Sequence, residues 1–141
     1  MEEPDIDSLS LRAYSEKGSR DDRSELWTAV FELESWYFVP RGLPEKPHVY
    51  VAQANEIEPD SYWIYAFTDS EKCADFIRKN NLGDDANSTL FLAMPNNDDL
   101  VPYLEGFSAQ GVKGVYFNSG KAGFYSALEQ LRVIKTYLNS I

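Results

Sequence analysis

The segment YWIYAFTDSE, residues 62–71, decides the fold class. Every side chain in 62–67 is aromatic or aliphatic, so a strand formed by these residues has two apolar faces and lies centrally in a sheet. Thr68 and Glu71 follow at the spacing of a capping box, in which both side chains satisfy free amides at a helix start. A buried strand that runs directly into a helix predicts a layered α/β fold.

The helix after this strand has one apolar stripe. Cys73, Phe76 and Ile77 recur at helical spacing on one face. Cys73 is therefore predicted to be a buried, unreactive thiol rather than an accessible nucleophile. Further strands are expected over 90–94 and 112–117, because both segments are short apolar runs bounded by turn residues.

Two more helices are expected in the second half of the chain. Asn96 or Asn97 is expected to cap the first, and Asp98 and Asp99 place negative charge at the favourable end of its dipole. Gly111 is expected to end it. Apolar residues at steps of three and four then predict a long amphipathic helix over 124–141.

The first half of the chain reads as helix, strand, loop and strand. Helical spacing starts near Asp22, which forms a variant capping box with Glu25. Strands are predicted over 36–39 and 48–52, and the segment 40–47 between them is rich in proline and glycine and is predicted to be a loop.

These elements predict one domain of the α/β (α+β) class. Its expected core is a single-layer mixed β-sheet of about five strands packed with helices, ending in a long amphipathic helix. Residues 1–19 are mostly polar and are expected to form a flexible acidic N-terminal arm, and residues 20–141 form the domain.

Composition excludes several classes of protein. The chain has 141 residues, 43% of them hydrophobic, and its single cysteine excludes an intramolecular disulfide framework. The net charge of −10 repels a phosphate backbone, so nucleic acid is not an expected partner. No apolar run approaches the ~20 residues of a membrane span, and no secretory signal is recognisable. A cytoplasmic protein without membrane association is expected.

The segment GVYFNSGKAG, residues 114–123, has the outline of a phosphate-binding loop. A P-loop needs four residues between two glycines, then Lys and Ser or Thr, whereas here five residues separate Gly114 from Gly120 and Ala122 follows the lysine. The residues are therefore predicted to form a structural strand-to-helix turn. Weak anion binding at Asn118, Ser119, Gly120 and Lys121 remains the alternative.

No cofactor, metal site or catalytic residue is predicted. His48 is the only histidine, and the sequence arranges no triad or metal partners around it. The pairs at 84–85 and 98–99 are both Asp-Asp, and neither has the spacing of an EF-hand.

Aromatic side chains are the better candidates for a functional surface. Strand alternation directs some of Trp36, Tyr37, Tyr62 and Trp63 outward unless helices cover both faces of the sheet. An exposed subset of these residues would form an interaction patch.

The order of segments resembles the SseB protein N-terminal domain family. ELWTAVFELESWYFVP (25–40) resembles its opening helix and strand, and YWIYAFTDSEKCADF (62–76) resembles its strand that ends in Phe-Thr-Ser or Phe-Thr-Asp. FLAMPNNDDLVPYL (91–104) stands at the position of its strand, proline and short helix, and GVYFNSG (114–120) at that of its Asn-Pro-Gly-like turn. The resemblance covers roughly 24–124.

This resemblance implies a cytoplasmic bacterial domain with no established enzyme activity. It supplies no catalytic residue, and Ser119 departs from the family, which often has proline at that position. The predicted function is a non-enzymatic protein-interaction or regulatory module. Two alternatives stay open: an acidic immunity- or inhibitor-type protein that covers a basic partner, and a small-ligand binder at the 118–121 turn. The identity of the partner and the oligomeric state also stay open.

Overall fold

A mixed β-sheet forms the centre of the protein. The computed structural model describes residues 5–43, 46–80 and 91–139. The sheet runs in the order β6-β1-β5-β7-β8, and β4 pairs with β5 off this path. Its strands are β1 (Ser35–Phe38), β4 (Val51–Gln53), β5 (Tyr62–Phe67), β6 (Leu92–Pro95), β7 (Val112–Phe117) and β8 (Phe124–Ala127). The predicted mixed sheet and α+β class are confirmed.

The strand β5 is central, as its composition predicts. It lies parallel to β7 and antiparallel to β1 and β4. The last residues of β5 pair with β1, and its first residues pair with β4, so the two short strands share one side of β5. Every residue of β5 after Tyr62 is buried, which explains why the strand has no polar face.

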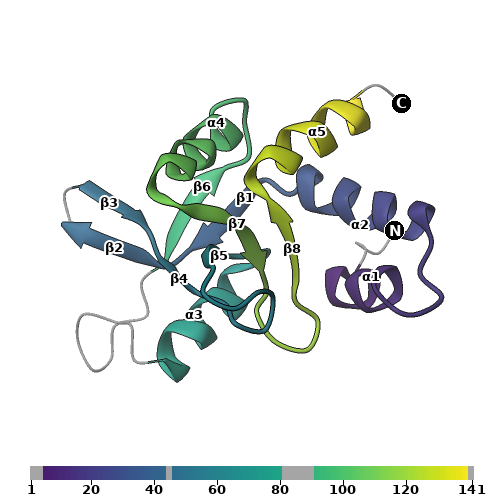
Figure 1. Cartoon of the computed structure of the whole chain (residues 1–141), viewed down its shortest axis with the longest axis horizontal. Helices are drawn as coiled ribbons and strands as arrows, with labels where there is room; N and C mark the ends of the chain where they lie inside the picture. The colour runs from purple at the N-terminus through teal and green to yellow at the C-terminus, as the bar shows by residue number, and fades with distance from the viewer. Residues whose placement is uncertain (1–4, 44–45, 81–90, 140–141) are drawn as a thin grey trace.

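Helices cover both faces of the sheet unequally. The helices α1 (Ile6–Ala13), α2 (Arg20–Glu32), α4 (Leu100–Glu105) and α5 (Leu128–Asn139) contribute to one apolar cluster. The helix α3 (Ser70–Lys79) contributes to the other. In Figure 1, α1, α2 and α5 lie on the right of the sheet, α3 below it and α4 above it.

Aromatic rings fill the larger cluster. Trp36 is fully buried and packs edge-on against Phe117, with ring centroids 5.0 Å apart. Trp27 of α2 makes similar contacts with Phe117 and Phe124. The Trp36 Nε1–H donates to the Val30 carbonyl at 2.9 Å, so the one polar atom of this buried ring is satisfied.

The smaller cluster lies under α3. Phe76 stacks on Tyr65 with centroids 5.3 Å apart, and Cys73 and Ile77 lie beside them. Cys73 is buried, which confirms its predicted position on the helix. Burial raises the pKa of its thiol to about 12, and the charge of Asp69 acts in the same direction, so the reactive thiolate is disfavoured.

The prediction of a loose arm over residues 1–19 is wrong for the part that the structure describes. Residues 6–13 form α1, which Asp5 caps by accepting the Asp7 N–H at 3.2 Å. Leu9 and Ala13 are buried against the larger cluster. One short apolar face is enough here because α2 provides the surface that covers it.

The helix α2 begins before the predicted position. Ser19 is its N-cap and forms a capping box with Asp22. The Ser19 Oγ accepts the Asp22 N–H, and the Asp22 carboxylate accepts the Ser19 N–H, both at 3.1 Å. Asp22 is therefore the N3 residue of the capping box, and Ser19 is its N-cap. The Ser19 backbone amide bond is the main cause of the lowered Asp22 pKa.

The segment predicted as a loop over 40–47 contains strands. Residues Pro40–Leu43 form β2 and Lys46–Val49 form β3, and they pair antiparallel as a separate hairpin. Pro47 pairs with Gly42, and a two-stranded hairpin tolerates proline because one side of each strand needs no partner. This hairpin projects to the left of the sheet in Figure 1.

The asparagines after β6 do not cap α4 as predicted. Asn96 instead donates from Nδ2 to the carbonyls of Phe31 and Leu33 at 2.7 and 3.1 Å, which ties β6 to the end of α2. Asn97 accepts the Asp99 N–H at 2.9 Å, and α4 starts only at Leu100.

Gly111 behaves as predicted. A 3₁₀ turn, η1 (Gly106–Gln110), continues α4, and Gly111 ends it with φ of 85°, a conformation that glycine adopts without strain. The predicted fourth strand is confirmed as β6, although Leu90 lies outside the described residues.

The last helix is shorter than predicted. Residues 124–127 form β8, antiparallel to β7, and α5 starts at Leu128. Phe124 and Ala127 fit a helical stripe in sequence, but pairing with Phe117 and Gly114 gives them an extended backbone. Gly114 allows this close pairing, because a Cβ there would lie 2.1 Å from the Ser126 carbonyl oxygen.

Candidate functional site

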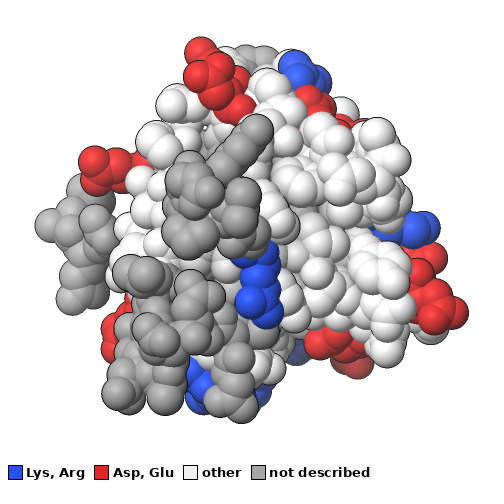
Figure 2. All heavy atoms as spheres, turned by 90° about the vertical axis from the view of Figure 1, so that its left-hand side faces the viewer, with Lys and Arg blue, Asp and Glu red and all other residues white. Residues whose placement is uncertain are grey.

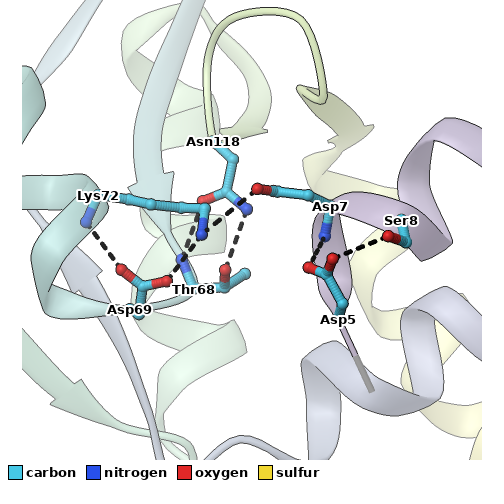
Figure 3. Close-up of polar contacts among 7 residues, drawn as sticks. All are labelled: Asp5, Asp7, Ser8, Thr68, Asp69, Lys72 and Asn118. Carbon is cyan, nitrogen blue, oxygen red and sulfur yellow. Dashed lines mark hydrogen bonds and ion pairs between the residues drawn. The ribbon is translucent and has the colours of Figure 1, made fainter. Parts of the chain in front are cut away.

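The carboxyl ends of β5 and β7 form the first candidate region. These strands are parallel, so both end at the same edge of the sheet, where Thr68 and Asn118 follow directly. Ligands of open α/β sheets bind outside the carboxyl ends of parallel strands. We call the group Asp7, Thr68, Asp69, Lys72 and Asn118 the polar junction (Figure 3).

Asn118 and Thr68 form the buried part of the polar junction. The Asn118 Oδ1 accepts the Thr68 N–H at 3.0 Å, and the Asn118 Nδ2 donates to the Thr68 Oγ1 at 3.0 Å. Both residues are buried. Asn118 has φ of 52°, a conformation that asparagine tolerates better than most residues. The two side chains are therefore committed to each other.

Thr68 is not the cap of α3, contrary to the sequence prediction. Asp69 is the N-cap, and its Oδ1 accepts the Lys72 N–H at 2.7 Å. Thr68 directs its hydroxyl to Asn118 across the sheet edge, which places the adjacent carboxylate at the helix start (Figure 3). Glu71 is exposed in the first turn of α3.

Lys72 joins two helices at the junction. Its Nζ lies 2.8 Å from the Asp69 Oδ2 and 3.5 Å from the Asp7 Oδ2, so it links α3 to α1. Burial lowers the Lys72 pKa, but the hydrogen bond and charge of Asp69, together with the charge of Asp7, outweigh this and raise it. The lysine is thus a fixed cation between two carboxylates.

A hollow of about 440 Å³ lies beside the polar junction. Lys72, Lys79 and Lys121 line it together with Asp7 and Asp75. Its described lining therefore mixes both signs of charge and favours neither anions nor cations.

The residues of the predicted anion turn do lie together, but in a different context. Asn118, Ser119, Gly120 and Lys121 belong to the turn that joins β7 to β8. The predicted strand-to-helix turn is wrong, because β8 separates it from α5. Lys121 consequently does not lie at a helix N-terminus, and the dipole argument for a bound anion no longer applies.

The predicted aromatic patch is also wrong as one exposed surface. Trp36 is fully buried and Trp63 is 4% exposed. They belong to opposite apolar clusters. Tyr37 is half-buried, and Tyr62, 47% exposed, stands at the start of β5. The helices cover both faces of the sheet, and this is the case in which the sequence predicted no outward-facing aromatic patch.

A groove between α2 and α5 is the second candidate region. Its volume is about 450 Å³. We call it the α2–α5 groove and define it by Arg20, Arg23, Trp27, Val133, Ile134 and Tyr137. Val133 is 57% exposed and Tyr137 is 40% exposed, so α5 presents apolar side chains outside the stripe that packs on the sheet.

Arginines line the other side of this groove. The Arg20 guanidinium lies over the Tyr137 ring, 5.6 Å from its centroid, in the range of cation–π contact. Neither Arg20 nor Arg23 forms an ion pair with any residue that the structure describes. The groove thus combines exposed apolar area with positive charge.

Sequence reasoning missed this groove because it needs two helices from opposite ends of the chain. The buried residues of α5 are Leu128 and Leu131, whereas Val133 and Tyr137, one turn apart, are exposed. The apolar residues Val133 and Tyr137, outside the core-facing stripe, were the feature of the sequence that could have indicated the groove.

Charge is distributed without one dominant acidic surface on the face that bears the β2–β3 hairpin. Among the described residues visible on this face, carboxylates lie mainly toward the margin, and Lys or Arg atoms lie near the centre beside uncharged residues (Figure 2). Across the ranges that the structure describes, no group of three or more His, Cys, Asp or Glu side chains is placed to hold a metal ion.

No helix in the described part of the chain has both the length and the apolar character needed to span a bilayer. Comparison with known proteins gives no match: no family model, no curated protein and no solved structure matches the chain. The geometry of these two regions therefore carries the information on function.

Proposed function

We propose that the chain is a non-enzymatic protein-interaction module that binds a partner protein in the α2–α5 groove. The observation that carries this proposal is the combination of exposed Val133 and Tyr137 with two arginines that have no described ion-pair partner. Single exposed apolar residues are ordinary on protein surfaces. A concave group of tyrosine, aliphatic and arginine side chains is typical of interface cores.

The polar junction supports the same proposal by contrast. Its asparagine, threonine, lysine and carboxylates already bind one another. A catalytic site holds some of its polar groups toward a substrate, whereas here these bonds join α1, α3 and the sheet.

Site-specific photocrosslinking tests the proposal. The photoreactive residue p-benzoylphenylalanine replaces Val133 in one variant and Tyr125, 51% exposed on β8, in a control variant. Irradiation of cells that produce each variant is expected to yield a discrete adduct with a second protein at position 133 and none at 125. Equal adducts at both positions, or no adduct at 133, would contradict the proposal.

An acidic inhibitor-type protein is a second candidate, favoured by the net charge of −10. Complementary fields accelerate association with a basic partner. The exposed acidic turn that contains Glu56 is then the contact surface. The same photoreactive residue at position 56 separates the two candidates, because adducts at 56 without adducts at 133 favour the inhibitor.

A further inference from the structure

The two arginines of the α2–α5 groove differ from six other basic residues of the protein and share with Lys17, Arg41, Lys79 and Lys121 the lack of an ion pair among the described residues. The following side chains lie within 4.0 Å of a carboxylate: Arg12, Lys72, Arg78, Lys113, Arg132 and Lys135. Arg20 and Arg23 have no such partner among the described residues, and the described lining of the groove contains no carboxylate. No carboxylate among the described residues therefore neutralises the positive charge at the groove.

Their position on α2 adds to this excess of charge. Arg20 is the first residue of the helix and Arg23 lies in the same turn. The N-terminal end of a helix carries partial positive charge, so cations there are unfavourable. The same turn also carries two carboxylates. Asp22 is bound to the Ser19 amide and to Arg12, and Asp21 is exposed and does not line the groove. An external carboxylate at this position would stabilise both arginines.

We propose that the occupant of the α2–α5 groove is an acidic amphipathic helix of a partner protein. This inference rests on the proposed interaction function. The apolar face of the partner helix packs on Val133, Ile134 and Tyr137, and its carboxylates bind Arg20 and Arg23.

The spacing of the groove residues matches a helix. Val133 and Tyr137 are four residues apart on α5, and Arg20 and Arg23 are three apart on α2, so each pair spans about one 5.4 Å turn. A helix lying along the groove repeats its side chains at the same interval. One row of apolar residues on the partner helix is expected to pack on α5, and one row of carboxylates is expected to face α2.

The net charge of −10 does not oppose this assignment. At physiological ionic strength, charges are screened over about 8 Å. Carboxylates elsewhere on the surface therefore act weakly on a ligand in the groove, and the adjacent arginines dominate.

A pair of designed peptides tests the inference on the full chain. Both are 18-residue helices with one leucine face; one carries glutamate beside that face and the other carries lysine at the same positions. Fluorescence anisotropy is expected to show about tenfold tighter binding of the glutamate peptide, the size of a favourable pair of interface charges. Arg20→Gln with Arg23→Gln is expected to remove this preference, whereas Arg78→Gln, which removes an exposed arginine on α3, leaves it unchanged.

Three results of the peptide experiment would overturn the inference. They are no binding of the glutamate peptide at millimolar concentration, equal binding of both peptides, or an equal loss of preference in Arg78→Gln. A concentration-dependent dimer that Val133→Glu dissociates would assign the groove to a second copy and also overturn it. Adducts at position 133 alongside any of the first three results leave the interaction function standing, so the two failures are distinguishable.

Discussion

The polar junction and the α2–α5 groove use charged side chains in opposite ways. In the junction, Lys72 lies between Asp69 and Asp7, and Asn118 bonds Thr68. In the groove, Arg20 and Arg23 face apolar side chains and meet no carboxylate of the described chain. The polar groups of the junction bond within the chain and stabilise the fold, whereas the arginines of the groove are available to a partner.

Asn118→Ala tests the junction most severely. It leaves the Thr68 N–H and hydroxyl without their buried partner and forces alanine into φ of 52°. The expected loss in free energy of unfolding is about 2–3 kcal/mol, measured by urea denaturation. Asn118→Gly removes the bonds without the backbone strain, so it should lose about 1 kcal/mol less. Equal stability of both variants would refute the strain argument.

Asp69→Ala tests the cap that the structure assigns to α3. The loss of the bond to the Lys72 N–H is expected to cost about 0.5–2 kcal/mol, again by urea denaturation. Glu71→Ala is the control, because Glu71 is exposed, and a change within about 0.5 kcal/mol is expected. A larger loss for Glu71→Ala than for Asp69→Ala would restore the Thr68–Glu71 capping box.

Lys72 gives the junction a small dependence on alkaline pH. Its folded pKa is raised above 10.5, so the folded state holds this proton more tightly than the unfolded state. The stabilisation is complete below 10.5 and is lost as the pH rises through the folded pKa. When the pH is raised from neutral to above 10.5, the free energy of unfolding should therefore fall less for Lys72→Met than for the wild type. Parallel pH profiles of the two proteins would argue against this role of the lysine.

The groove is expected to respond least in stability. Arg20→Gln with Arg23→Gln removes two exposed side chains that have no described ion pair and lie at an unfavourable end of α2. The free energy of unfolding, measured by thermal denaturation, should fall by no more than about 0.5 kcal/mol or should rise slightly. A loss comparable to that of Asn118→Ala would show that these arginines serve the fold after all.

The sequence predicted the elements whose local pattern and tertiary setting agree. The strands 62–67 and 112–117 are apolar throughout and lie in the middle of the sheet. The segment 124–127 was predicted to be helical from its apolar spacing, but its pairing with β7 makes it a strand. The helix α1 could not be predicted from its own few apolar residues, because α2 supplies its cover.

The candidate sites were less predictable than the fold. Thr68 is a residue type that often caps helices, but its hydroxyl instead accepts a hydrogen bond from Asn118, 50 residues away. The four residues of the 118–121 turn were correctly grouped, while their link to a helix start was not. The α2–α5 groove joins residues more than one hundred positions apart, and no local spacing indicates such a meeting.

The strand order also determines how this protein can be divided. The strands β1 and β5 come from the first half of the chain, and β6 and β7, from the second half, flank them on either side. A cut between residues 80 and 91 would therefore leave the first fragment with two uncovered strand edges and the second with no central strand. The two halves are interleaved, so each completes the sheet of the other. We therefore expect the two fragments to fold only when they are mixed, as the pieces of a split reporter do.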